Sequence, residues 1–248
     1  MKTVPNSTKS ILLLILLIGA ALADEIKSLN LQYHYDLKRE HPTATLEYYG
    51  TDKLGFWFFF SDVNFDHTLK AGGASDFYFE LMRYFQLIKI KGMNLTATIQ
   101  YNDGNFPTEN AWLAGLNLNN ILIGPVNIST DLLLKKNYKL NVDWQWTVVW
   151  YSDFINHKLV FNGYFDLWKN DNTNAHRPDF SPEVKKTILS FQWEPQIGWQ
   201  ITPHWKIGNE WEISKGFLGA VTGELAKNEA YEYEKWYFLP TLFIQFNF

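Results

Sequence analysis

The sequence predicts an all-β protein: a transmembrane, antiparallel up-and-down β-barrel of about twelve strands. Three observations favour this fold. Apolar and polar residues alternate along most of the chain, an alternating strand ends the chain, and long connections tend to alternate with short ones. The 248 residues include 17% aromatic side chains and no cysteine. Membrane barrels use many aromatic residues in girdles at both interfaces, and a backbone bonded into a closed ring needs no disulfides.

The first 23 residues have the pattern of a cleaved secretory signal peptide, which leaves residues 24–248 as a single barrel domain. Lys2 and Lys9 precede an apolar run over 11–18, and Ala21-Leu22-Ala23 supplies an A-x-A ending. The run is shorter than the roughly 20 residues of a membrane helix, although a retained anchor helix is the alternative. An exported chain without cysteine is expected in the outer membrane of a Gram-negative bacterium.

The C-terminal strand is the strongest single indication of a membrane barrel. From Leu242 to Phe248 every second residue is apolar, and two of the three residues between them are amides. In a soluble sandwich or barrel, the alternative, such an uncovered edge would invite aggregation. In an outer-membrane barrel the apolar face meets lipid and the last strand closes against the first. A terminal Phe also resembles the recognition signal of such barrels, so the expected partners are the lipid bilayer and the barrel-assembly machinery.

Each strand is predicted from its own alternation. In the first strand, leucine and tyrosine lie on one face and Asn30, Gln32 and His34 lie on the other. In the second, apolar residues lie opposite threonine and Glu47. The third is apolar on both faces, whereas the fourth places phenylalanines opposite tyrosines and Glu80. Most strands are near the 9 to 11 residues that a tilted membrane strand needs. The first six predicted strands cover 28–37, 43–49, 54–62, 76–88, 93–101 and 110–118.

The second half of the chain continues in the same way. The clearest strand is the eighth, where three tryptophans and two valines share a face opposite Asp143, Gln145 and Thr147. The eleventh alternates tryptophan and isoleucine with Lys206 and Glu210. The last six predicted strands cover 126–134, 140–151, 157–168, 187–199, 205–214 and 236–248.

The connections give an independent test of the topology. Membrane barrels have long extracellular loops and short periplasmic turns, whereas a soluble sandwich has no reason to sort its loops by length. The long set comprises 64–75, 102–109, 169–185 and 215–231, and the short set comprises 50–53, 89–92, 153–156 and 202–204.

Motifs of other functional classes are missing from the sequence. It has no G-x-S-x-G or H-E-x-x-H motif, and its six histidines are not at ligand spacing. A Ser–His pair on the outer wall is an alternative that sequence alone does not support. The Asn- and Asp-rich loop 170–174 lacks the glycine and closing glutamate of a calcium loop. A net charge of −4 argues against nucleic acid. We therefore expect no enzyme, no metal and no cofactor.

The inward faces of the strands hold the candidate site. If Asp62 faces a water-filled lumen, Phe56, Phe58 and Phe60 share its face, because side chains alternate along a strand. Rings stack on a planar solute, while carboxylates and amides bond its polar edge. The alternative turns these rings to lipid and Trp57 inward, with Phe59. The candidate solute-binding residues are His34, Glu47, Phe56, Phe58, Phe60, Asp62 and Glu80.

Several of these stretches resemble a known family. Thr45-Leu46-Glu47-Tyr48, a short polar turn and the aromatic stretch 56–62 are similar to the early region of the nucleoside-specific outer-membrane channels, the Tsx family. Residues 79–81 with Arg83 resemble its next strand, Tyr33-His34 its first strand, and 246–248 its terminus. The resemblance is best over 29–87 and continues more weakly to Phe248.

The resemblance implies a twelve-stranded barrel that passes nucleosides passively, with Glu47, Asp62 and Glu80 as lumen carboxylates and Phe58 and Phe60 as stacking residues. One departure concerns Arg83, which simple alternation with Glu80 points outward unless a bulge turns it in. The expected function is a passive channel for nucleosides or similar small planar polar solutes. The alternatives are a general small porin, a structural or adhesive barrel without transport, and a soluble periplasmic barrel that binds an apolar ligand.

Overall fold

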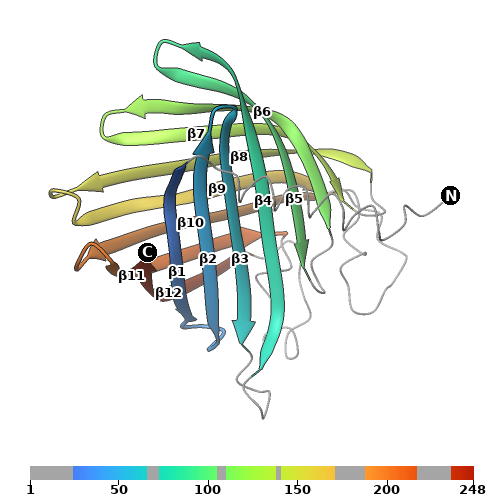
Figure 1. Ribbon diagram of the computed structural model, residues 1–248. Coiled ribbons are helices and arrows are strands. Elements are labelled where there is room, and N and C mark those ends of the chain that lie inside the picture. The colour runs from blue at the N-terminus through green and yellow to red at the C-terminus, as the bar shows by residue number, and fades with distance from the viewer. Residues whose placement is uncertain (1–24, 66–72, 105–109, 138–140, 171–187, 217–235) are drawn as a thin grey trace, which may run out of the picture.

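Twelve antiparallel strands close into one barrel in the computed structural model (Figure 1). The structure describes residues 25–65, 73–104, 110–137, 141–170, 188–216 and 236–248. The strands are β1 (Glu25–Asp36), β2 (Pro42–Asp52), β3 (Gly55–Phe65), β4 (Ala74–Ile90), β5 (Met93–Gly104), β6 (Ala111–Ile123), β7 (Val126–Asn137), β8 (Val142–Phe154), β9 (Leu159–Asn170), β10 (Ile188–Gln200), β11 (Trp205–Lys215) and β12 (Trp236–Asn247). The predicted number of strands and their antiparallel order are confirmed. Within the described ranges, no helix is long and apolar enough to cross a membrane.

Closure is made by the two ends of the chain. Residues Asn30–Asp36 of β1 pair with Thr241–Asn247 of β12, and every other pair joins strands that are consecutive in sequence. Because no strand edge is left open, the backbone groups of the wall are bonded within it, which is the condition for placing strands in lipid. The predicted signal peptide, residues 1–23, lies outside the described residues.

The strands meet at two different ends, called here the turn end and the loop end. The turn end carries the short connections 53–54, 91–92, 124–125, 155–158 and 201–204. Left-handed residues allow several of these tight turns, such as Lys91 and Gly92 with φ of 49° and 90°. The β4–β5 hairpin extends past the start of β3, because Gly55 pairs with Phe85 and β4 continues to Ile90 (Figure 1).

The loop end is less uniform than the sequence predicts. The connections 66–73, 105–110, 171–187 and 216–235 are long, and they contain most of the residues outside the described ranges. Two connections at the same end, 37–41 and 138–141, are short. The tendency of long and short connections to alternate therefore holds for four of the six connections at this end.

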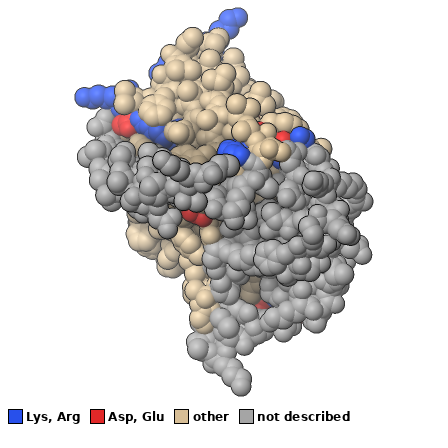
Figure 2. Space-filling model, turned by 90° about the vertical axis from the view of Figure 1, so that its right-hand side faces the viewer, with Lys and Arg blue, Asp and Glu red and all other residues tan. Residues whose placement is uncertain are grey.

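Apolar side chains cover the outside of the wall and polar side chains line the inside. On β1, Leu31 and Tyr33 are 45% and 50% exposed, whereas Asn30 and Gln32 are 4% and 2% exposed. Figure 2 shows one face of the molecule, where most of the described surface is uncharged. A soluble protein avoids apolar patches of this extent, whereas lipid accommodates them. The prediction that the apolar side chains of the strands face outward is confirmed.

Aromatic residues gather at both ends of this outer surface. At the loop end, the rings stand on the first residues of strands, and at the turn end they flank the β10–β11 turn. Trp205 and Phe246 pack edge to face there, with ring centres 4.9 Å apart. Such rings prefer the interface between hydrocarbon and water, so the two groups mark the two membrane surfaces. They are Trp112, Trp144 and Trp236 at the loop end and Trp199, Trp205 and Phe246 at the turn end.

Arg83 faces outward, as simple alternation predicts. It pairs with Trp57, and its guanidinium lies 4.6 Å from the centre of the Trp57 ring and 4.8 Å from that of Phe85. It also bonds Asp52 Oδ1 at 2.8 Å, and only 3% of Arg83 is exposed. The register of β4 with β5 shifts between Gln86 and Ile88, beyond Arg83, so no bulge turns Arg83 into the lumen. Two rings and a carboxylate instead shield its charge.

Candidate solute pathway

The phenylalanines of β3 face the inside of the barrel. Phe60 pairs with Glu47 of β2, and Glu47 pairs with the buried Asn30 of β1. Cross-strand partners lie on the same face of a sheet, so Phe56, Phe58 and Phe60 share the inward face with Asn30. The alternative that turned these rings to lipid is wrong, and Trp57 and Phe59 face outward.

These rings form the core of an aromatic ladder, which consists of Phe56, Phe58, Phe60, Tyr49, Tyr78 and Tyr84. The ring centres of Phe58 and Phe60 are 6.3 Å apart. Phe56 stacks on Tyr84 at 4.2 Å with an interplanar angle of 12°. Tyr78 meets the edge of Phe60 at 5.8 Å. The phenylalanine rings remain partly exposed, so the ladder offers successive apolar faces along the pathway.

Each predicted carboxylate lies inward beside the ladder and accepts a hydrogen bond. Asn30 Nδ2 donates to Glu47 Oε2 at 3.0 Å, and Thr45 Oγ1 donates to Asp62 Oδ1 at 2.5 Å. Glu80 accepts from the Tyr78 hydroxyl and from Asn102 Nδ2, the latter at 2.8 Å. These bonds hold the carboxylates in place, while each retains further acceptor capacity.

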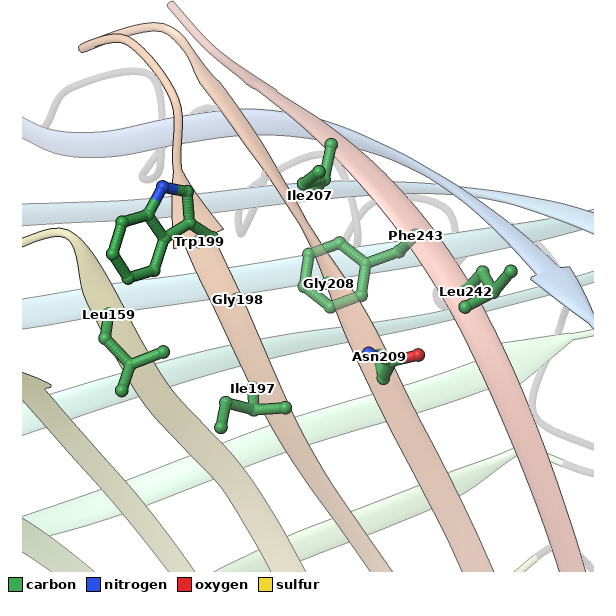
Figure 3. Close-up of a pocket in the computed structure, with 9 residues that line it drawn as sticks. All are labelled: Leu159, Ile197, Gly198, Trp199, Ile207, Gly208, Asn209, Leu242 and Phe243. Atoms are coloured by element: carbon green, nitrogen blue, oxygen red, sulfur yellow. The ribbon is translucent and has the colours of Figure 1, made fainter.

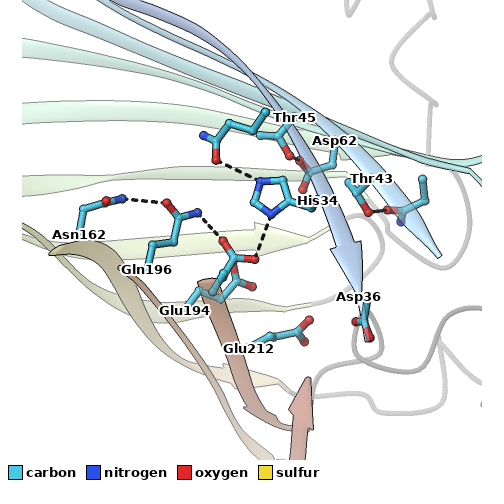
Figure 4. Close-up of polar contacts among 12 residues, drawn as sticks. His34, Asp36, Thr43, Thr45, Asp62, Asn162, Glu194, Gln196 and Glu212 are labelled. Carbon is cyan, nitrogen blue, oxygen red and sulfur yellow. Dashed lines mark hydrogen bonds and ion pairs between the residues drawn. The ribbon is translucent and has the colours of Figure 1, made fainter. Parts of the chain in front are cut away.

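His34 belongs to a row of bonded side chains that we call the polar belt (Figure 4). Its Nδ1 lies 3.6 Å from Glu210 Oε1, and its Nε2 lies 3.0 Å from Gln32 Oε1. The belt crosses from β9 to β2 and passes over the junction of β1 with β12. Its members in order are Asn162, Gln196, Glu210, His34, Gln32, Asn30 and Glu47.

Carboxylates outnumber cations inside the barrel. The inward-facing basic residues of the strands are Lys135 and Lys206, with Lys89 on the same face at the exposed turn end of β4. The inward-facing carboxylates of the strands include Asp36, Glu47, Asp62, Glu80, Asp131, Asp143, Asp166, Glu194, Glu210 and Glu212, with Glu25 and Asp153 at the turn end. The sequence analysis gave Asp131 and Lys135 no direction, although pairing of Asp131 with Thr147 would have supplied it.

A third cation, Arg39, reaches the lumen wall from the β1–β2 connection. Its Nε lies 2.5 Å from Asp36 Oδ2, and its NH2 lies 3.2 Å from Glu212 Oε2. Burial lowers the pKa of the Arg39 guanidinium, but the carboxylates of Glu212 and Asp36 outweigh burial, and the net pKa is above its ordinary value. Sequence analysis missed this residue, because a turn has no periodicity that would assign a direction.

Charged side chains on opposite sides of the lumen interact electrostatically. The carboxylates of Glu80 on β4 and Asp166 on β9 interact electrostatically, and Lys135 on β7 attracts both. Lys135 Nζ also lies 2.9 Å from Gln145 Oε1. Strands far apart in the sheet therefore contribute charges to the same pathway. Within the described residues, no three His, Cys, Asp or Glu side chains are grouped so that they could hold a metal ion.

An apolar recess of about 490 Å³ lies on the outer wall rather than in the lumen (Figure 3). Gly198 and Gly208 pair at its floor, and Phe243 covers them from the inner side. The ring lies 2.7 Å from the position that a Cβ of Gly208 would occupy, so a larger residue there would displace it. The recess is lined mainly by lipid-facing residues, and it is separate from the aromatic ladder.

The fold and the polar lumen define the class of this protein: a β-barrel of the outer-membrane type. The chain belongs to the family described as a domain of unknown function, DUF5020, whose model matches residues 28–248. No curated protein sequence matches the chain significantly.

Solved structures share the architecture. A KdgM porin has a TM-score of 0.53 at 8% identity, over 89% of this chain and 99% of that one. A NanC porin has a TM-score of 0.53 at 12% identity, over 89% and 98%. A KdgM porin in complex with disordered oligogalacturonate has a TM-score of 0.52 at 8% identity, over 89% of this chain and 99% of that one. At such low identity the likeness establishes the fold alone.

Proposed function

We propose that the protein is a passive outer-membrane channel for nucleosides or similar small planar polar solutes. The observation that carries this proposal is the aromatic ladder, because its phenylalanines leave ring surface exposed on the inward face of a polar lumen. A base would stack on Phe58 or Phe60, while Glu47, Asp62 or Glu80 would accept hydrogen bonds from its polar edge. No step needs energy or a cofactor, because weak sites in series let a solute enter and leave.

The same proposal assigns a location and partners. An export signal in residues 1–23 would carry the chain to the outer membrane of a Gram-negative bacterium, where the apolar outer wall meets the lipid bilayer. The barrel-assembly machinery would recognise the last strand, which ends at the exposed Phe248. The Tsx-like stretches support a nucleoside as the solute, and the inward direction of β3 is compatible with them.

The charge of the lumen argues against the kind of solute that one structural neighbour was captured with. That KdgM porin was captured with oligogalacturonate, which is a polyanion. Carboxylates such as Glu80 and Asp166 would repel a polyanion here. A neutral or positively charged solute suits this interior better.

A barrel without transport, structural or adhesive, is the second candidate. It is favoured by the close packing of part of the interior, where Gln32 is 2% and Asn117 1% exposed, and by the buried group of Ala111, Leu113 and Leu133. A barrel filled with side chains would pass no solute of nucleoside size.

Liposome swelling separates these possibilities. We expect liposomes that contain the purified protein to swell faster in a nucleoside such as uridine than in a sugar of equal size. Equal rates would replace the specific channel with a general small porin. If neither solute entered while the protein was folded in the membrane, the barrel would be structural.

Removing ladder rings should weaken nucleoside binding. Each stacking ring contributes about 0.5–1.5 kcal/mol, so F58A and F60A should each weaken block of the ion current by a nucleoside by roughly 2–10-fold. The matched control is F59A on the outward face of the same strand, which should leave block unchanged. Equal block in F58A, F60A and the unchanged protein would show that these rings do not stack on the solute.

A further inference from the structure

We infer that the channel selects small planar cations, which are solutes that carry an ammonium, amidinium or guanidinium group beside a flat ring. This inference rests on the proposed function, because it uses the same aromatic ladder. It goes further in naming the charge and the hydrogen-bonding groups of the preferred solute. Two independent observations support it: carboxylates without basic partners, and buried acceptor atoms without donors.

The carboxylates nearest the ladder lack ion-pair partners among the residues that the structure describes. Among the described residues, Glu47, Asp62 and Glu80 form no ion pair with Lys or Arg, and neither do Asp166 and Glu194 across the lumen. Hydrogen bonds from neutral groups, and longer-range attraction to Lys135, Lys206 and Arg39, balance these charges in part. The potential along the ladder is therefore negative, and it attracts cations.

The basic side chains of the interior are engaged elsewhere. Arg39 is held by Asp36 and Glu212 at the loop end. Lys206 Nζ lies 5.3 Å from the centre of the Phe243 ring, and Lys135 Nζ lies 4.8 Å from that of Trp168. These lysines already use the cation–aromatic contact that the ladder would offer to a solute.

The second observation concerns buried polar atoms that lack a hydrogen-bond partner. Asn102 is 5% exposed, and its Oδ1 has no partner. Among the inward-facing strand residues that the structure describes, every unpartnered side-chain atom is an acceptor or a hydroxyl oxygen, and none is an N–H group. Such an interior is complementary to a solute that donates hydrogen bonds. The atoms are Thr98 Oγ1, Asn102 Oδ1, Asp131 Oδ1, Asn162 Oδ1 and Gln245 Oε1.

Neighbouring carboxylates fix the orientation of two of these amides. A carboxylate accepts hydrogen bonds, so the nitrogen of Asn102, not its oxygen, faces Glu80. In the same way Gln196 turns its nitrogen to Glu210, and its oxygen then accepts from Asn162 Nδ2 (Figure 4). The amide oxygens of Asn102 and Asn162 are thus left for other donors. The carboxylates and the amides therefore place the same kind of atom, an acceptor, on the inward face of the wall.

A planar cation satisfies all of these features at once. Its ring stacks on Phe58 or Phe60, its N–H groups donate to Glu80 and to the Asn102 oxygen, and its charge is balanced by the carboxylates. A neutral solute of the same shape keeps the stacking but loses the charge-assisted hydrogen bonds, which are about twice as strong as neutral ones. An anion of the same shape is repelled.

Three indole compounds of similar size test this inference: tryptamine, tryptophol and indole-3-acetate, which carry an ammonium, a hydroxyl and a carboxylate. In planar bilayers containing the full protein, we expect a reversal potential that favours K⁺ over Cl⁻. Tryptamine should block the current at a concentration on the order of tenfold lower than tryptophol, and indole-3-acetate should block least. Low salt should increase these differences, because screening is weaker there.

A charge-neutral variant tests whether the preference for a cationic solute arises at the ladder. In E80Q the advantage of tryptamine over tryptophol should fall on the order of tenfold. The control D103N removes the same charge from an outward-facing residue near the loop end of β5, which pairs with Phe79, and should change nothing. D62N provides a second test if E80Q does not fold.

The outcomes separate this inference from the proposed function. Equal block by tryptamine and tryptophol, with K⁺ and Cl⁻ equally permeant, would overturn the cation preference, while nucleoside-induced swelling would still support the channel. The absence of both nucleoside flux and indole block would overturn both.

Discussion

Replacing Arg39 with Met should destabilise the barrel by about 3–5 kcal/mol, the usual cost of breaking a buried ion pair from one side. Arg39 contacts Asp36 and Glu212, whose side chains are 3% and 9% exposed. Methionine keeps the length of the side chain but leaves two buried carboxylates facing each other across β12. Unfolding in urea from lipid vesicles, followed by heat-modifiable gel migration, measures the loss.

Two further variants isolate the electrostatic cause. K38M removes a positive charge from the neighbouring exposed residue of the same connection and should cost little. Adding E212Q to R39M should recover part of the lost stability, because one fewer carboxylate is uncompensated. If R39M were no less stable than K38M, the Arg39 contacts would not stabilise the barrel.

The second large effect is expected on the outer wall. L132R should cost about 2–4 kcal/mol, because it places a charge near the middle of the lipid-facing side of β7. Leu132 is 67% exposed in the structure, so a soluble barrel would tolerate the same change with little loss. The fraction of protein that folds into vesicles, measured by protease protection, gives the result.

A matched substitution separates membrane depth from exposure. Ile123, on the outward face of β6 at the turn end, is 62% exposed. I123R should therefore cost no more than about 1 kcal/mol, because charges near the interface are tolerated. Equal effects of L132R and I123R would contradict the assignment of the outer wall to lipid.

Much of the fold follows from local sequence because a strand has a period of two residues. Leu31 and Gln32 differ in polarity, and the structure sends them to opposite faces as predicted. In β3 this signal fails, because Trp57 and Phe58 are equally apolar. The direction of β3 is set by its neighbour: the pairing of Glu47 with Phe60 places the phenylalanines inside. A strand that is apolar on both faces needs its partner strand to be interpreted.

Features that depend on distance in space were not predictable. The alternation of β9 indicates that Asp166 faces inward, but not that it interacts with Glu80 across the lumen. No local pattern predicts the direction of the Arg39 side chain, because Arg39 lies in a turn. Strand ends were also underestimated: β4 runs from Ala74 to Ile90, beyond the expected 76–88, because its hairpin with β5 continues past the edge of β3. The roles of the predicted site residues in solute binding remain predictions.

The polar belt has a consequence for biogenesis. Asn30 and His34 are synthesised early, yet His34 meets Glu210 only after β11 has been made and the ring has closed. A nascent chain that lacked its last strands would leave His34 without its contact to Glu210. The belt is therefore complete only in the closed ring, and its contacts across the β1–β12 junction stabilise the closed form over an open sheet.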